Sequence, residues 1–376
     1  MKDLRLLQII PSLESGGAEQ GTIDVANYIA EQGFESVVVS SGGRMLNHLS
    51  QKGVHHLHLP VHSKNPIAIF KNIKKIKNIV LNNKINLVHV RSRAPAWSVY
   101  FACNNLCRST STFHNVYGHQ NVFKRFYNKG LSKVDNIVAI SEYVKKLISD
   151  IYKINEKKIT VIYRGIDIDL FNPEINDEIK FSKFFSKYNL PGDKKIILYP
   201  GRLTQWKGQI EFLDILKSLD LNNIICYFIG DDKNLSYKSK LEKELYKRNL
   251  NLDCKILGHL PKEDMRLMYK SSDLIISSPL KPEGFGRVIS EGLAMKKIVL
   301  CYNFGGPKEQ ILGLDNLYAI EPYNTKQMLK NINIALNLPK NKIIQMGEIA
   351  RQHIQKKFSK QIMLKNYFKF YQKIIL

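Results

Sequence analysis

The residues best suited to chemistry in this sequence are two glutamates, Glu283 and Glu291, eight positions apart in the segment SSPLKPEGFGRVISEGLAMKK. A carboxylate accepts hydrogen bonds from neighbouring hydroxyls, so the pair could hold a sugar ring and a ribose on either side of a phosphate group. The phosphate itself would repel both acids and needs cations. In the alternative interpretation, Glu283 is a solvated loop acid and Glu291 only pairs with Arg287 one helical turn away.

Two basic residues could supply that positive charge. Arg202 and Lys207 lie in the segment GRLTQWKG, which follows an apolar run at 195–199. A guanidinium fork and an ammonium point charge can together neutralise a diphosphate. The alternative is an ordinary pair of solvated loop cations.

Glycine turns between strands and helices must position these four side chains. The apolar run 274–278 predicts a buried parallel strand, followed by a loop with Glu283 and then a helix. A second strand at 298–302 ends in a glycine turn at 303–307. Two adjacent units of this kind direct free backbone N–H groups and two helix N-termini at one crevice, which suits a diphosphate.

The N-terminal half repeats this pattern. A strand at 4–10 is followed by Gly16 and Gly17 and then a helix, although Ala18 rules out the GxGxxG fingerprint. Strands at 87–90 and 110–113 place further polar residues at their C-terminal ends, on the side where open α/β sheets bind ligands. These residues are Arg91, Arg93, His114 and Tyr117. A structural histidine is the alternative for His114.

Length and strand–helix alternation together predict two domains. The chain has 376 residues, and the alternation restarts at 195 after a connection at 164–173. Alternating strands and helices predict parallel sheets with right-handed crossovers, so the expected fold class is α/β. From 358 onward, apolar residues at helical spacing predict a long closing helix.

Charge is unevenly distributed. The net charge is +24, and between Glu35 and Asp135 there is no acidic residue but fifteen Lys and Arg and eight of the ten His. Such a surface attracts anions, which favours a phosphorylated glycolipid or a membrane face as partner, with nucleic acid as the competing interpretation. The segment 67–80, with Phe70 on its apolar face, predicts an amphipathic helix that lies either on an anionic membrane or on the protein core.

Other sequence features bear on location and metals. No uncharged apolar segment reaches the roughly 18 residues of a membrane span, and the N-terminus predicts a first strand and not a signal peptide. We therefore expect a cytoplasmic protein. Its five cysteines contain no zinc-like CxxC pair, which favours reduced thiols and predicts no metal site.

Four motifs in order resemble glycosyltransferase family 4. They are GGAE at 16–19, GRLTQWKG at 201–208, EGFGRVISE at 283–291 and GGP at 305–307. The resemblance covers nearly the whole chain and implies the GT-B architecture, with two Rossmann-like, doubly wound parallel-sheet domains facing a central cleft. RSRAPAW at 91–97 and FHNVYG at 113–118 are similar to a bacterial subgroup assigned to lipopolysaccharide core synthesis.

The resemblance also implies roles for individual residues. It places residues 1–170 in the acceptor domain, 171–355 in the nucleotide-sugar donor domain, and 356–376 in a helix that crosses back. Arg202 and Lys207 would bind the diphosphate, and Glu291 the ribose. The catalytic residues would be His114 and Glu283. The remaining donor contacts would be Gly16, Gly17, Gly284, Phe285 and Gly286, and the acceptor-side candidates are Arg91, Arg93 and Tyr117.

The expected activity is a retaining hexosyl transfer from a nucleotide-diphosphate sugar, without a metal ion or cofactor. The acceptor would be a hydroxyl of an anionic, membrane-associated glycolipid such as lipopolysaccharide core, which implies peripheral contact with the cytoplasmic membrane face. A nucleotide-sugar epimerase of the same fold and a basic nucleic-acid-binding protein are the alternatives. One departure from the family is Arg164, where the connecting segment often has Asn. We expect it to alter hinge contacts and not the chemistry.

Overall fold

The computed structural model describes residues 3–14, 16–49, 53–63, 65–115, 117–118 and 121–375. The chain forms two compact units. Unit 1 comprises Met1–Gly165 together with Gln361–Leu376, and unit 2 comprises Ile166–Lys360. Because the last segment of the chain belongs to unit 1, this unit is built from two separate stretches of sequence.

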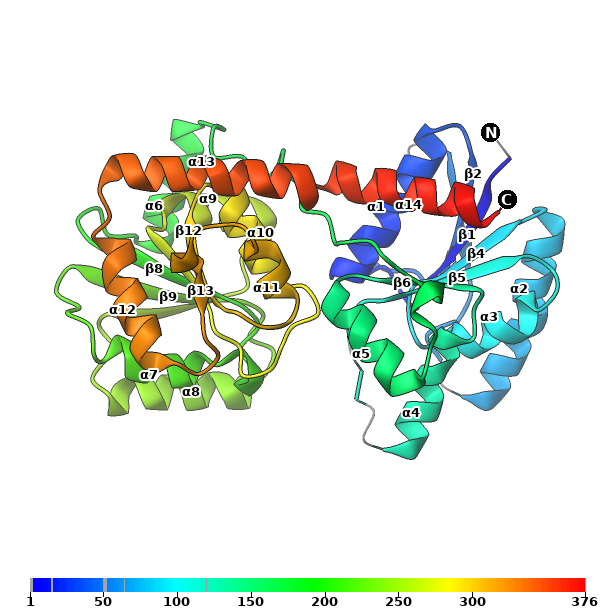
Figure 1. Cartoon of the computed structure of the whole chain (residues 1–376), viewed down its shortest axis with the longest axis horizontal. Helices are drawn as coiled ribbons and strands as arrows, with labels where there is room; N and C mark the ends of the chain where they lie inside the picture. Colours follow the sequence, from blue (N-terminus) through cyan, green and yellow to red (C-terminus); the bar gives the residue numbers. More distant parts are fainter. Residues whose placement is uncertain are drawn as a thin grey trace. The chain divides into compact units, whose positions relative to one another are not determined.

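Unit 1 is a parallel sheet that carries helices on both faces (Figure 1). Over the described residues the sheet has seven strands in the order β3-β2-β1-β4-β5-β6-β7. The strands are β1 (Arg5–Ile9), β2 (Glu35–Ser40), β3 (Val54–His58), β4 (Leu87–Val90), β5 (Arg108–Phe113), β6 (Asn136–Ala139) and β7 (Ile159–Val161). The helices are α1 (Gly17–Glu31), α2 (Pro66–Asn82), α3 (Ala96–Cys103), α4 (Val122–Lys129), α5 (Glu142–Tyr152) and α14 (Lys360–Ile374), with short 3-10 turns η1 (Leu46–His48), η3 (Gly130–Ser132) and η4 (Glu156–Lys158).

The strand order of unit 1 reverses beside β1. β1 pairs in parallel with β2 on one side and with β4 on the other, so the chain winds outward in both directions from this point. All four residues of β4 are buried, as expected for a central parallel strand covered on both faces. The loops after β1 and β4 therefore leave the sheet at a topological switch point, where α/β folds bind ligands.

The C-terminal helix completes the core of unit 1. Tyr367, Phe370 and Tyr371 of α14 pack in one buried cluster with Leu4 and Leu6 of the first strand region. Buried His89 of β4 makes a 2.6 Å hydrogen bond between Nδ1 and the Tyr371 hydroxyl, and a 2.8 Å hydrogen bond between Nε2 and Thr112 Oγ1. Both ring nitrogens are thus satisfied only when α14 is in place.

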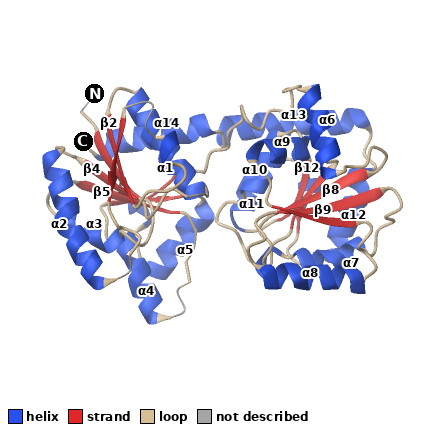
Figure 2. Cartoon of the chain, turned by 180° about the vertical axis from the view of Figure 1, so that it is seen from behind, coloured by secondary structure: helices blue, strands red, loops and turns tan. Residues whose placement is uncertain are grey.

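Unit 2 is a second parallel sheet with helices on both faces, as Figure 2 shows. In its described residues the strand order is β10-β9-β8-β11-β12-β13. The strands are β8 (Lys195–Pro200), β9 (Ile224–Ile229), β10 (Cys254–Gly258), β11 (Leu274–Ser277), β12 (Ile298–Tyr302) and β13 (Ala319–Ile320). The helices are α6 (Glu178–Tyr188), α7 (Gln209–Leu216), α8 (Leu235–Lys247), α9 (Lys262–Ser271), α10 (Arg287–Ala294), α11 (Gly305–Ile311), α12 (Thr325–Leu336) and α13 (Lys340–Lys357), with η5 (Gln205–Lys207) and η6 (Asn316–Tyr318).

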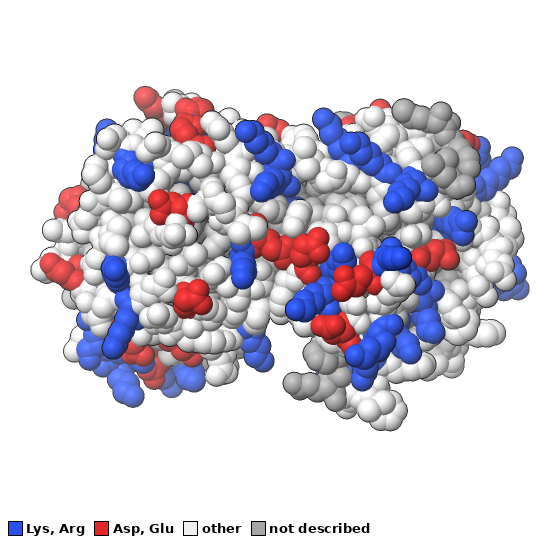
Figure 3. Space-filling view, viewed as in Figure 1, with Lys and Arg blue, Asp and Glu red and all other residues white. Residues whose placement is uncertain are grey.

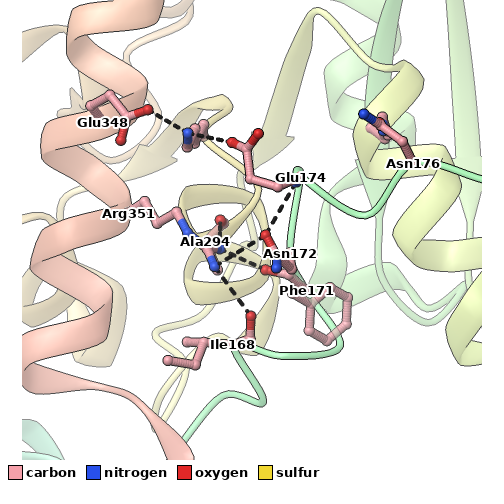
Figure 4. Close-up of polar contacts among 10 residues, drawn as sticks. Ile168, Phe171, Asn172, Glu174, Asn176, Ala294, Glu348 and Arg351 are labelled. Carbon is pink, nitrogen blue, oxygen red and sulfur yellow. Dashed lines mark hydrogen bonds and ion pairs between the residues drawn. The ribbon is translucent and has the colours of Figure 1, made fainter.

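Arg351 of α13 ties the first segment of unit 2 to its helices (Figure 4). Its guanidinium donates to the backbone carbonyls of Phe171 and Ala294 at 2.8 and 2.5 Å, and to that of Ile168 at 3.3 Å. Carbonyl oxygens left over at a helix end and in a connecting loop are thereby satisfied by one buried side chain. The segment that enters unit 2 is therefore fixed to α10 and α13.

The structure confirms the predicted fold class, because both sheets are parallel and both units alternate strands with helices. Three local predictions need correction or addition. Phe70 lies on the exposed side of α2, not on its packed face. β3 and β13 were not predicted, since β3 is rich in histidine and β13 has two residues. The closing helix begins at Lys360, after a break from α13.

None of the helices in the described part of the chain combines the length and apolarity needed to cross a membrane.

The contact between His89 and Tyr371 gives a testable prediction. Tyr371→Phe removes the hydroxyl and leaves a buried imidazole nitrogen without its partner, so the free energy of unfolding of unit 1 should fall by roughly 1–3 kcal/mol. Urea unfolding followed by circular dichroism measures the change. The matched control is Tyr246→Phe, which alters an exposed tyrosine and should leave stability unchanged. Equal stability of the Tyr371→Phe variant and the unmodified protein would contradict the role given to α14.

Candidate functional site

The loop between β8 and α7 holds Lys207 in a fixed position. The Tyr199 hydroxyl at the end of β8 donates to the Lys207 carbonyl at 2.6 Å and lies 2.9 Å from Ser278 Oγ. Gly208 has a left-handed backbone with φ of 81°, and a Cβ there would lie 2.4 Å from the Ser278 carbonyl oxygen. Only glycine allows this approach, so the loop is locked against the end of β11.

The side chains of Lys207 and Glu283 meet directly. Lys207 Nζ donates to Glu283 Oε1 at 2.6 Å, and the two side chains are only 12% and 13% exposed. The ammonium also lies 4.5 Å from the centroid of the Trp206 ring, within the range of a cation–π contact. Glu283 is therefore not a solvated loop acid, and Lys207 is not a solvated loop cation.

The loop after β11 interlocks with the turn after β12. Gly306 N–H donates to the Glu283 carbonyl at 2.9 Å, and a Cβ on Gly306 would lie 2.4 Å from the Gly284 carbonyl oxygen. Gln310 Nε2 donates to the carbonyls of Phe285 and Gly286. The two predicted strand–glycine–helix units thus lie side by side, and each holds the other's backbone.

Glu291 lies on α10 and is mostly buried. Its Oε1 accepts from Arg287 Nη2 at 2.7 Å, and its Oε2 accepts from the Tyr269 hydroxyl at 2.9 Å. Burial first, and then the Glu291 charge, hold the pKa of Tyr269 well above its ordinary value. The i,i+4 pair of the alternative interpretation is therefore present, but a buried tyrosine also orients the carboxylate.

The remaining predicted donor residues of unit 2 differ in exposure. Arg202 is exposed, and its backbone carbonyl accepts from Gln209 Nε2 at 2.9 Å. The Phe285 ring is buried, 6.0 Å from the Phe358 ring, so residue 285 could meet a ligand only through its backbone. The structure brings Lys207 and Glu283 into contact, whereas the polar contacts of Glu291 go to Arg287 and Tyr269.

In unit 1, the N-terminus of α1 lies under a guanidinium. Gly16 has φ of 127°, and a Cβ on Gly17 would lie 2.1 Å from Arg164 Nη1. Glu19 folds back over Gly16, where a Cβ would lie 2.6 Å from its Oε2. Burial raises the pKa of Glu19, and its backbone hydrogen bond and Arg164 partly oppose that rise. The helix N-terminus therefore faces one carboxylate and one guanidinium.

Arg164 also fixes the tautomer of His114. Arg164 Nη2 lies 3.1 Å from His114 Nδ1. A guanidinium has only donors, so Nδ1 must be the acceptor and the proton of the neutral ring must be on Nε2. Burial, followed by the charges of Arg164 and Arg91, lowers the pKa of His114 well below its ordinary value. The Arg91 backbone partly opposes this fall in the pKa, but no partner within the described part of the chain meets the buried Nε2 with hydrogen-bond geometry.

The acceptor-side candidates differ in burial and in their contacts. Arg91 is 1% exposed, with its Nε 3.2 Å from Thr22 Oγ1 and its guanidinium 5.2 Å from the Tyr367 ring centroid. In this position it offers no surface to a ligand, and its acceptor role stays a prediction. The Arg93 guanidinium lies 4.1 Å from the Tyr117 ring centroid, and its Nη1 donates to Asn128. Val116 of the FHNVYG segment falls outside the described residues.

Sequence reasoning missed two residues that shape these clusters. Arg164 was expected to act at the hinge, yet it contacts His114 and covers Gly17. Nothing in the sequence marks Tyr269, because a tyrosine on the buried face of a helix carries no functional signal of its own. Over the described residues, no three His, Cys, Asp or Glu side chains group as metal ligands.

Comparison with known proteins decides the family. The model "Glycosyltransferase Family 4" matches residues 15–170, and "Glycosyl transferases group 1" matches residues 180–353. A crystal structure of a glycosyltransferase from Rickettsia africae ESF-5 is 35% identical, covers 100% of this chain and 99% of that chain, and has a TM-score of 0.90. The chain belongs to glycosyltransferase family 4. It transfers a sugar from a nucleotide-sugar donor, and enzymes of this family typically retain configuration.

Two further matches are more distant. The structure of HepE from Anabaena in complex with UDP-glucose has a TM-score of 0.81 at 18% identity, with 98% of this chain and 100% of that chain covered. At that identity the likeness shows the GT-B fold alone. The lipopolysaccharide 1,2-N-acetylglucosaminetransferase of Salmonella typhimurium (strain LT2) is 23% identical over 246 residues, which are 62% of each chain.

The contact between Arg164 and His114 can be tested by titration. Arg164→Met removes a positive charge that disfavours the imidazolium, so the pKa of His114 should rise toward its ordinary value. Gly17→Ala should act in the same direction, because its methyl group would displace the end of the flexible Arg164 side chain. Gly118→Ala is the control, since nothing lies within 4 Å of a Cβ there. NMR titration of the His114 ring gives the readout, and an unchanged pKa in both variants would show the contact to be absent in solution.

Proposed function

We propose that this family 4 enzyme is a metal-independent, retaining hexosyltransferase that moves a sugar from a nucleotide-diphosphate donor to a hydroxyl of an anionic, membrane-associated glycolipid. Lipopolysaccharide core is the acceptor we favour. In this proposal the N-terminal domain, residues 1–170, receives the acceptor, and residues 171–355 bind the donor. The observation that carries the proposal is the Lys207–Glu283 pair, which sets a cation and a carboxylate side by side between glycine turns.

Lys207 and Arg202 act on the diphosphate. An ammonium has three N–H donors, so Lys207 can keep its bond to Glu283 while it donates to a phosphate oxygen. Arg202 is exposed and can approach a second oxygen with its fork. As the bond between sugar and phosphate breaks, negative charge grows on the leaving diphosphate, and cations already in place stabilise it. These two cations supply the charge that a metal would otherwise provide.

The carboxylates act on hydroxyl groups. Glu283 Oε2 accepts no hydrogen bond from the described part of the chain, so it can accept from a donor-sugar hydroxyl. The backbone of 284–286 is the second contact that we assign to that sugar. Glu291 is oriented by Tyr269 and Arg287 and is assigned to the ribose. The HepE complex with UDP-glucose makes UDP the first nucleotide to test.

Unit 1 supplies hydrogen-bond donors. His114 is neutral with its proton on Nε2, so we assign it a contact with an oxygen near the reacting centre and not the role of a general base. Gly16 and Gly17 are assigned to a phosphate at the N-terminus of α1. Glu19 and Arg164 occupy the space beside these glycines, so binding there requires the Glu19 carboxylate to move aside, while the Arg164 guanidinium can pair with the phosphate. Attack on the face from which the diphosphate leaves, with a phosphate oxygen taking the proton from the acceptor hydroxyl, would retain configuration.

The acceptor assignment rests on charge and on relatives. The stretch between Glu35 and Asp135 has no acid, which favours an anionic acceptor. The Salmonella typhimurium relative carries the name of a lipopolysaccharide glycosyltransferase, and so does a solved structure of comparable fold, the outer core galactosyltransferase WaaB, with a TM-score of 0.74 at 13% identity.

Substitution of the two cations tests the phosphate assignment. Lys207→Ala and Arg202→Ala should each lower kcat by about 10²- to 10³-fold, as removal of a transition-state donor does. Release of UDP from UDP-sugars measures turnover. Lys326→Ala, at an exposed lysine of α12, is the control and should keep full activity. Full turnover in both test variants, with unchanged melting temperatures, would refute the assignment.

A donor screen separates the alternatives. Nucleoside diphosphates and their sugars should raise the melting temperature, because a ligand that binds only the folded state stabilises it. We expect the largest shift with UDP compounds. Conversion of the donor into an isomer without any acceptor would instead indicate an epimerase. Salt-sensitive binding to generic DNA, with no shift from any nucleotide sugar, would indicate a nucleic-acid-binding protein.

A further inference from the structure

An exposed apolar surface lies on one side of unit 1. We define the α4 surface as Val122, Phe123 and Phe126 of α4 together with Phe101 of α3. These side chains are 80%, 85%, 64% and 57% exposed, in that order. Positions 122, 123 and 126 share one face of a helix because they are three and four residues apart. Large apolar side chains gathered in this way mark a site of interaction.

α4 has the reverse of the usual amphipathic arrangement. Its one buried residue is polar Asn128, whose Nδ2 donates to the Gly118 carbonyl at 3.0 Å and whose Oδ1 accepts from Arg93. Val122, Phe123 and Phe126 face outward, whereas Tyr127 is half-buried. A helix of a soluble protein normally buries its apolar face, so the outward face of α4 is suited to an apolar environment beyond this chain.

Two aromatic rings of the α4 surface, Phe126 and Phe101, are held in place by Trp97. Trp97 stacks between Phe126, at 4.9 Å and 20°, and Phe101, at 6.1 Å and 26°. Its indole N–H donates to the Tyr127 carbonyl at 3.2 Å. The stack prevents these rings from folding back onto the protein. A surface preorganised in this way loses little side-chain freedom when it binds.

The charge on α4 itself is positive. The adjoining α5, whose Ile151 carbonyl accepts from Arg125 Nη2 at 2.7 Å, carries two acids and two lysines and so adds no net charge. Lys124, Arg125 and Lys129 of α4 are exposed. The sequence has no acid between Glu35 and Asp135, so neither α4 nor the α2 and α3 helices supply a negative charge. In Figure 3 the lower edge of unit 1, where α4 lies, is uncharged on the face shown, and both Lys or Arg and Asp or Glu side chains lie above it. Figures 1 and 2 both show α4 projecting at that edge.

The N-terminal part of α2 also exposes apolar side chains on unit 1. α2 packs on α3, where Ser98 Oγ donates to the Ile69 carbonyl at 3.2 Å. Beside Ile69, Phe70 is 76% exposed, and Ile67 is 66% exposed. Lys71 and Lys74 of the same helix face solvent. α2 is thus a packed helix with a lysine face that also presents two apolar side chains outward.

We propose that the α4 surface inserts into the headgroup region of an anionic lipid bilayer. Phenylalanine rings enter the boundary between headgroups and acyl chains, and the flanking lysine and arginine side chains pair with lipid phosphates. A projecting apolar tip with a basic rim fits a planar membrane better than a groove-binding peptide. This inference rests on the proposed function, because membrane contact would bring the enzyme to a membrane-borne acceptor.

Vesicle co-sedimentation of the full chain tests the proposal. The protein should bind vesicles of phosphatidylcholine mixed with phosphatidylglycerol, and bind much less to phosphatidylcholine alone. Val122→Ser with Phe123→Ser should lower the partition coefficient at least about tenfold. Lys124→Gln and Lys129→Gln should each lower it about fivefold. The matched control is Leu235→Ser with Leu252→Ser, at two exposed leucines of unit 2, and should change nothing.

Each other outcome overturns the proposal. The proposal would be refuted if the protein did not bind the mixed vesicles, or if the Val122→Ser, Phe123→Ser variant bound them as strongly as the unmodified protein. Self-association on ultracentrifugation that this variant abolishes, without vesicle binding, would assign the surface to a second copy of the chain. The measurements distinguish a failure of the membrane proposal from a failure of the transferase proposal. Loss of vesicle binding with normal release of UDP from UDP-sugars leaves the transferase assignment intact, and vesicle binding without affinity for nucleotide sugars leaves only the docking surface.

Discussion

The Lys207–Glu283 ion pair is the interaction on which the arrangement of the loops after β8 and β11 depends, and the proposed donor site is built on it. It joins two loops that leave neighbouring strands β8 and β11, and glycine at 208 permits the close approach that brings them together. A mostly buried ion pair contributes little net stability, because desolvation offsets the attraction between the charges. Its value here is orientation. It holds an ammonium and a carboxylate at fixed positions before any ligand arrives, so little reorganisation remains when the donor binds.

The corresponding cluster of unit 1 is built around two hydrogen-bond donors, the Arg164 guanidinium and the Nε2–H group of His114. Arg164 forces the proton of His114 onto Nε2, and the bare backbone of Gly17 gives the guanidinium its space. A neutral imidazole beside a permanent cation can present an N–H group without taking up a proton in the physiological range. Glu19 supplies a carboxylate at the same helix end. The hydrogen-bonding direction of this cluster is therefore set by one residue from the connecting segment.

Much of the fold was predictable from local patterns. Apolar runs ending in glycine turns fixed the position of β8, β11 and β12, and their order predicted parallel sheets. The contact between Lys207 and Glu283 agrees with the prediction that the loops after β8 and β11 face one crevice, whereas the site roles of Arg202 and Glu291 stay predictions. The partner of His114 could not be predicted, because Arg164 is fifty residues away in sequence and reaches it only through the tertiary fold. Phe70 and α4 were beyond prediction for another reason. Helical periodicity identifies an apolar face, but it does not say whether that face meets the core or the solvent.

The discontinuous make-up of unit 1 has a consequence for how the polypeptide matures. Ribosomes deliver the N-terminal strands first, but the aromatic residues of α14 that close over Leu4, Leu6 and His89 come after all of unit 2. Unit 2 can acquire its native structure while the nascent N-terminal sheet still lacks one covering helix. The part of the protein that is synthesised first is thus the last to be completed. One face of its sheet stays exposed until α14 has been synthesised, and exposed apolar surface of this kind is what chaperones bind.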